Sequence, residues 1–118
     1  SFKHGDGTAT GFADNSFDAV TVSFAMHDVP FEVGVRLLAE ARRVVKDEGF
    51  LFVIDYNDLS SFGSRLLHLV ARLYESPNYR PFVKRGLRRS LVRGGWRLQH
   101  KSTFLGAVQM VKAVPQPS

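Results

Sequence analysis

Residues that could bind a small molecule gather in the stretch HGDGTATGFADNSFDAVTVSFAMHDVP, which runs from residue 4 to residue 30. Asp6 and Gly7 follow a short stub, residues 2–4, while Ser23 comes at the end of an apolar run. A carboxylate, or a backbone N–H group freed by the glycine, can hydrogen-bond the amino edge of a nucleobase. A Gly-Asp-Gly sequence is also a common turn. Both interpretations of Asp6 therefore stay open.

The remaining sequence offers no pattern typical of a metal site. His4, His68 and His100 share no metal-ligand spacing with one another. The chain contains no cysteine, which excludes disulfides, thiolate metal sites and cysteine nucleophiles. We therefore expect no bound metal, and the lack of cysteine favours the cytoplasm as the compartment.

The first half of the chain alternates between strand-like and helix-like patterns. Residues 19–26, AVTVSFAM, are nearly all apolar or small, which predicts a central strand covered on both faces. Apolar side chains at helical spacing between residues 33 and 45 predict a helix that begins after Pro30 and ends at Gly49. FLFVID, residues 50–55, is a second buried strand. Together they predict a right-handed βαβ unit with parallel strands.

The second half predicts two helices and then two strands. One helix begins at Ser60 or Ser61 and ends at Pro77, and another spans residues 82–92 before Gly94-Gly95. Residues 96–105 and 107–114 predict strands joined tightly at Gly106, hence antiparallel. The expected order is β-α-β-α-α-β-β, an α/β fold. Ligands of such sheets bind beyond the carboxyl ends of the parallel strands, where residues 5–7, 23–28 and 55–58 are expected.

Charge is distributed unevenly along the chain. Residues 1–60 contain five basic and ten acidic side chains, a net charge of −5, whereas residues 61–118 contain eleven basic and one acidic, a net charge of +10. The segment YRPFVKRGLRRSLVRGGWR could bind phosphates of nucleic acid or an anionic membrane surface. It could equally be a solvated helical face that complements acidic residues elsewhere in the protein.

The order of these motifs resembles the second half of the class I S-adenosylmethionine-dependent methyltransferases. The resemblance is carried by the opening stretch, the amphipathic helix, the FLFVIDY that follows it, and the closing LVRGGWRLQHKSTFLGAVQMVKAV. It covers residues 2–114 and is greatest to the ubiquinone/menaquinone biosynthesis C-methyltransferases. It implies the C-terminal part of a Rossmann-like sheet, mostly parallel, that closes with an antiparallel strand pair.

The resemblance also implies where the cofactor S-adenosylmethionine would lie. Asp6 and Gly7 are expected to meet its adenine. Ser23 is expected beside its methionine part, and Phe24 and Ala25 line the same cleft. A carboxylate and a hydroxyl would then follow adjacent strands because one extended ligand crosses both strand ends.

This sequence differs from the family at its beginning. It contains no GxGxG-type loop and no strand ending in an acidic residue that would hold the ribose, and Gly5, Gly7 and Gly11 are spaced differently. In the family those elements precede the segment present in this chain. We therefore expect residues 1–118 to form a single partial domain, the C-terminal half of a methyltransferase without its glycine-loop half. Such a piece should not bind the cofactor with useful affinity. We also expect it to self-associate, to aggregate or to be rescued by pairing with the missing half.

His27 and Asp28 are the candidates for a catalytic role. Methyl transfer needs a general base only when the acceptor must lose a proton, and imidazole suits that role. A histidine after a buried strand can also be a hydrogen-bonded cap. Asp55 and Tyr56 could line the acceptor pocket. The family's inserted helical region forms the acceptor lid, and the corresponding apolar residues of this chain suit either an apolar acceptor or a plain core: Phe62, Leu66, Leu69, Leu73, Tyr74, Tyr79 and Phe82.

Two functions from different classes follow from the sequence. The first is S-adenosylmethionine-dependent methyl transfer to a small apolar acceptor, such as a quinone precursor or a lipid, by an enzyme that is inactive as an isolated fragment. The second is a non-catalytic binding module that uses the basic half to associate with nucleic acid, a membrane surface or another chain. An RNA methyltransferase would combine the chemistry of the first with the charge of the second.

Overall fold

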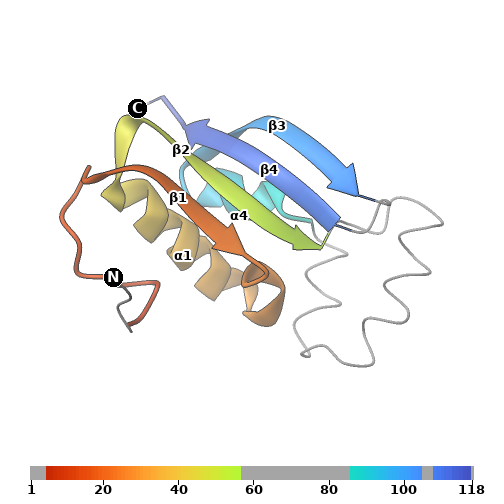
Figure 1. Ribbon diagram of the computed structural model, residues 1–118. Helices are drawn as coiled ribbons and strands as arrows, with labels where there is room; N and C mark the ends of the chain where they lie inside the picture. Colours follow the sequence, from red (N-terminus) through yellow and green to blue (C-terminus); the bar gives the residue numbers. More distant parts are fainter. Residues whose placement is uncertain (1–4, 57–85, 105–107, 118) are drawn as a thin grey trace.

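A four-stranded mixed sheet organises the protein (Figure 1). The computed structural model describes residues 5–56, 86–104 and 108–117. The strands are β1 (Phe17–Ser23), β2 (Val45–Tyr56), β3 (Trp96–Phe104) and β4 (Val108–Pro115), in the spatial order β1-β2-β4-β3. β1 and β2 are parallel, and β4 runs antiparallel to both β2 and β3. The predicted α/β fold, its parallel βαβ unit and its closing antiparallel pair are confirmed. The expectation of a mostly parallel sheet needs correction, because in the described residues β1 and β2 are the parallel pair and β4 lies antiparallel between β2 and β3.

In the described residues, two helices and one short turn accompany the sheet. A 3-10 turn, η1 (Met26–Asp28), leads through Pro30 into α1 (Phe31–Val44), and α4 (Arg88–Arg93) precedes β3. The predicted helix over residues 60–77, the start of the helix expected from residue 82 and the Gly106 junction lie outside the described residues. No helix in the ranges described is long and apolar enough to cross a membrane.

The core lies between the two helices and one face of the sheet. Leu38 of α1 and Leu91 of α4 belong to the same buried cluster as Leu51, Val53 and Val111 of the sheet. Burying these apolar side chains is the main favourable contribution to folding. Trp96 is fully buried, and its indole N–H donates to the backbone carbonyl of Leu38 at 2.8 Å. The start of β3 is therefore tied to the middle of α1.

The predicted end of the first helix at Gly49 was wrong. α1 ends at Val44, and the next residue, Val45, already has extended backbone angles and begins β2. Val45 is fully buried in the core, so packing favours an immediate change of direction there. Gly49 lies within β2, where a Cβ atom would come within 2.6 Å of the Asp18 carbonyl oxygen. The glycine therefore permits close approach of β1 and β2 beside an irregular register between Phe17 and Ala19.

The prediction of a central strand over residues 19–26 also needs correction. β1 spans Phe17–Ser23 and lies at the edge of the described sheet, with β2 on one side (Figure 1). Most of its residues are exposed, and the Phe17 side chain retains 38% of its surface. The strand ends because Phe24 has a φ of 51°, a left-handed conformation that breaks the extended backbone.

The Gly94-Gly95 end of the second predicted helix is confirmed. The Gly94 N–H donates to the carbonyl oxygens of Ser90 and Leu91, as expected at a helix C-terminus. Gly95 has a φ of 93°, which suits glycine because it lacks a Cβ atom. The chain then turns directly into β3, so this short helix stays close to the sheet.

Replacing Gly49 by alanine is expected to destabilise the fold by about 1 to 3 kcal/mol, because the added methyl group would crowd the Asp18 carbonyl and the Val45 side chain. Urea denaturation measures the loss. The matched control is Gly5→Ala, where a Cβ atom would meet nothing within 4 Å. Equal stability of the two variants would contradict the close approach of the strands at Gly49.

Candidate functional site

A buried carboxylate joins the carboxyl ends of β1 and β2. Asp55 is completely buried, and its Oδ1 atom lies 2.8 Å from His27 Nδ1. The backbone N–H groups of Met26 and Tyr56 donate to the same carboxylate at 2.9 and 2.8 Å. Three donors therefore converge on one side chain, and they hold the η1 turn against the end of β2.

These contacts affect the protonation of Asp55 and the tautomer of His27. Burial raises the pKa of Asp55, and the hydrogen bonds from Tyr56, Met26 and His27 oppose that rise. Because the backbone groups can only donate, they favour the charged carboxylate. Beside a charged carboxylate, His27 Nδ1 can only be the hydrogen-bond donor to Asp55, while Nε2 lies 3.4 Å from the Asp28 carboxylate. The side chain of Asp28 is about half exposed.

An aromatic cluster surrounds this histidine. The Tyr56 ring centroid lies 4.8 Å from that of His27, and the Phe24 centroid lies 5.6 Å from that of Tyr56. Phe24 is exposed because the left-handed backbone turns it away from the core. Ser23 is exposed at the end of β1, and Ala25, just before η1, is half-buried. Four sequence-predicted residues, Ser23, Phe24, Ala25 and His27, thus lie on one continuous segment beyond β1.

Asp6 and Gly7 form a turn, one of the two interpretations left open by the sequence. Asp6 Oδ1 accepts hydrogen bonds from the Thr8 backbone N–H at 2.9 Å and the Thr8 hydroxyl at 2.7 Å. These two bonds lower the pKa of Asp6, so its carboxylate is charged at neutral pH. The carbonyl of Asp6 accepts from the Ala9 N–H. Gly7 lies against Leu37 of α1, where a Cβ atom would come within 2.7 Å of a leucine methyl group.

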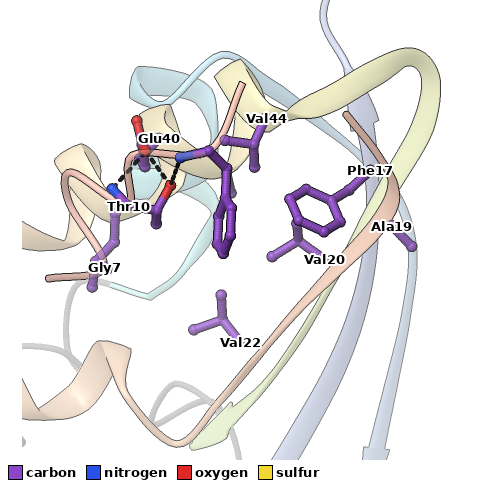
Figure 2. A pocket seen from close by; sticks show the side chains of 11 residues that line it. Gly7, Thr10, Phe17, Ala19, Val20, Val22, Glu40 and Val44 are labelled. Carbon is purple, nitrogen blue, oxygen red and sulfur yellow. Dashed lines mark hydrogen bonds between the residues drawn. The ribbon is translucent and has the colours of Figure 1, made fainter. Parts of the chain in front are cut away.

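An apolar cleft lies between this loop, β1 and α1 (Figure 2). Its volume is about 320 Å³. The lining is apolar apart from two residues, Thr10 and Glu40, which hydrogen-bond to each other along one side. The other lining residues are Gly7, Phe12, Phe17, Ala19, Val20, Val22, Leu37, Ala41 and Val44.

Glu40 is a site residue that the sequence did not single out. Its Oε2 atom accepts from the Thr10 backbone N–H at 2.8 Å and the Thr10 hydroxyl at 2.6 Å. Arg43 donates to both carboxylate oxygens at 2.8 Å and also pairs with Asp14. These contacts, led by Arg43, lower the pKa of Glu40 to about 2. The only feature of the sequence that could have indicated this contact is the spacing of Glu40 and Arg43, which lie three residues apart on one face of a helix.

The sequence is similar to known methyltransferases over its first half and beyond. Residues 1–53 match the family described as "Methyltransferase domain". A demethylmenaquinone methyltransferase of Corynebacterium efficiens is 40% identical over 82 residues, which cover 61% of this chain and 34% of the relative. Another, from Bacillus velezensis, is 29% identical over 109 residues, covering 92% of this chain and 44% of the relative. The chain thus spans less than half the length of these curated relatives.

The fold is similar to that of several solved structures, which include a methyltransferase. CalO1, a methyltransferase in calicheamicin biosynthesis solved in its SAH-bound form, matches with a TM-score of 0.69 and 21% identity, covering 96% of this chain and 33% of that one. TnmH matches with a TM-score of 0.75 and 17% identity, covering 98% and 35%. Fold and sequence together confirm the resemblance to class I S-adenosylmethionine-dependent methyltransferases. Within that class, the relatives from Corynebacterium efficiens and Bacillus velezensis are both demethylmenaquinone methyltransferases.

No group of three or more histidine, cysteine, aspartate or glutamate side chains that could hold a metal ion occurs in the part of the chain that the structure describes. Of the histidines considered for such a role, His100 lies on β3 and its Nε2 is 3.1 Å from the Ser102 hydroxyl. His4 and His68 are outside the described residues.

Asp55→Asn is expected to cost about 1 to 3 kcal/mol of stability. An asparagine has one acceptor oxygen where three donors use two, so a buried donor loses its partner. Asp28→Asn is the matched control, and we expect it to cost less than about 1 kcal/mol because Asp28 is half exposed. Urea denaturation of both variants would decide, and a larger loss for Asp28→Asn would show that the wrong carboxylate had been identified as the partner of His27.

Proposed function

We propose that this chain contributes the acceptor-side half of an S-adenosylmethionine-dependent methyltransferase that acts on a small apolar acceptor, such as a quinone precursor or a lipid. The observation that carries the proposal is the similarity to a demethylmenaquinone methyltransferase across 92% of the chain. The aromatic cluster of Phe24, His27 and Tyr56 supports an acceptor with an apolar ring.

The proposed cofactor contacts are Asp6, Gly7, Ser23, Phe24 and Ala25. The turn fits this role because Asp6 is exposed and ionised, and because its described hydrogen bonds use Oδ1 only. Phe24 fits because its exposed ring offers an apolar face at the end of β1. The cofactor supplies an activated methyl group on a sulfonium. The chain's own task is to hold that group in line with the acceptor, which accelerates transfer by orientation.

We further propose that His27 is the general base where the acceptor must lose a proton. Asp55 favours the imidazole tautomer with its proton on Nδ1, in which Nε2 can accept a proton, and it stabilises the imidazolium that forms. His27 itself is buried, with Nε2 beside the half-exposed Asp28. Asp28 then gives the proton a path from the imidazole toward solvent. The pair named from adjacency in the sequence thereby acquires a third member, Asp55.

The proposed enzyme needs more chain than these 118 residues. The matched regions make up 34% and 44% of the two relatives, and the sequence has no glycine-rich loop to let the backbone approach the cofactor. β1, an apolar strand at the edge of the described sheet, is the place where we propose that the other half pairs. The same edge explains why we expect the isolated chain to self-associate.

Within residues 86–104 and 108–117, a binding module or RNA methyltransferase that uses the basic half gains no specific support. Arg89 and Arg93 each lie 5.4 Å from the centroid of Phe31, and Arg93 also approaches Glu32 at 3.6 Å. Lys112 lies 4.8 Å from the Phe50 centroid. These cations contact the protein's own surface. Binding of nucleic acid or membrane through the basic half therefore stays a prediction.

In the full-length protein that contains this sequence, Asp6→Ala and Ser23→Phe are expected to weaken binding of S-adenosylhomocysteine by about 1 to 3 kcal/mol each. Asp6→Ala removes a proposed polar contact with the ligand, and Ser23→Phe places a bulky side chain where the ligand is proposed to cross the end of β1. Isothermal titration calorimetry measures both, with Asp18→Ala as a control because Asp18 is exposed and pairs with Lys46 alone among the described contacts. The 118-residue chain by itself should show no binding at micromolar concentration. Unchanged affinity in both variants would refute the proposed cofactor contacts.

His27→Gln in the full-length protein is expected to lower kcat for an acceptor that must lose a proton by about 100-fold or more, because glutamine cannot accept that proton. The affinity for S-adenosylhomocysteine should change little, since His27 is proposed to act on the acceptor. A kcat close to that of the unsubstituted protein would refute the general-base role and would show that His27 is a structural residue at the end of the sheet.

A further inference from the structure

The loop that carries Asp6 touches α1 at two places. Gly7 lies against Leu37, and Thr10 donates twice to Glu40, so the two contacts are three residues apart on each segment. Residues spaced three apart share one face of a helix. Figure 2 shows Thr10 reaching across to Glu40 along one side of the cleft, with Gly7 next to it.

Glu40 holds the loop more firmly than a surface ion pair would. The residue is 9% exposed and receives four hydrogen bonds, two from Thr10 and two from Arg43. Hydrogen bonds to a charged acceptor are shorter and stronger than neutral ones. Arg43 adds a bond to Asp14, and its backbone carbonyl accepts from the Asn15 N–H at 2.9 Å. Residues 10–15 have no regular secondary structure, so these bonds determine their path.

We propose that Glu40 is a positioning residue for the cofactor: by fixing Thr10 it sets where the Asp6-Gly7 turn lies against α1, and so where the adenine would be held. This inference rests on the proposed function. Glu40 itself need not touch the cofactor. Because α1 also follows directly from the segment containing His27 and Asp28, one rigid helix relates both ends of the proposed site.

The test compares Glu40→Ala with Glu32→Ala in the full-length protein. Both substitutions remove a carboxylate from α1, but Glu32 is exposed and pairs with Arg93 rather than with the loop. Glu40→Ala should weaken binding of S-adenosylhomocysteine by about tenfold or more and speed amide hydrogen exchange in residues 6–12, because the loop loses its charged acceptor. Glu32→Ala should change neither, and protection within α1 should persist in both variants.

A milder pair of variants covers the case in which Glu40→Ala does not fold. Thr10→Ser keeps both donors to Glu40, whereas Thr10→Val keeps the shape and the backbone donor but loses the hydroxyl. We expect normal cofactor affinity for the serine variant and several-fold weaker affinity for the valine variant. Equal affinities for serine and valine would overturn the inference.

A double substitution separates positioning from a general loss of stability. If Glu40 acts through the turn, Glu40→Ala should cost less affinity when Asp6→Ala is already present, because the contact that it positions is gone. An undiminished effect in that background would overturn the inference, as would faster loop exchange with unchanged affinity. A full-length protein that binds no S-adenosylhomocysteine at all would instead refute the proposed function, and this inference with it.

Discussion

The completely buried Asp55 carboxylate is the constraint on which the end of the sheet depends. An ionised carboxylate out of water is costly unless hydrogen-bonded, and here two backbone groups and His27 supply the donors. The chain must therefore return beyond β1 so that Met26 and His27 reach the end of β2. The η1 turn and the left-handed Phe24 produce that return. The hydrogen bonds that stabilise the fold thus also hold the His27 imidazole in one orientation beyond the carboxyl ends of β1 and β2.

The sequence predicted those helices and strands whose residue pattern can be recognised within the element itself. The spacing of Leu38, Ala41 and Val44 indicated the buried face of α1, and FLFVID indicated the core of β2. The errors arose where a tertiary contact outweighed the local signal. Gly49 looks like a helix stop, but burial of Val45 starts the strand earlier and leaves the glycine at a close approach between strands. The apolar character of β1 predicted burial, yet the strand lies at the edge of the described sheet.

The sequence named residues of the candidate site, but it did not show which side chains contact one another. The family resemblance indicated Asp6 and Ser23, and the acid–base chemistry of imidazole indicated His27, but adjacency suggested Asp28 as the partner of the histidine. The partner at Nδ1 is Asp55, 28 residues away, and Thr10 meets Glu40 across 30 residues. No single sequence period encodes such pairs. They arise because the βαβ crossover brings the ends of parallel strands to one edge and lays the preceding loop against the crossover helix.

Two hydrogen-bonded groups among the described residues lie toward opposite ends of α1. His27, which is hydrogen-bonded to Asp55 of β2, precedes the N-terminus of α1, while Glu40 and Arg43 lie near its C-terminus and hold the loop that carries Asp6. An apolar contact such as that of Gly7 with Leu37 can hold the loop close without defining its register, because dispersion attraction has little directionality. Hydrogen bonds to a charged carboxylate do define register. A loop without secondary structure can then present a binding group at a fixed place.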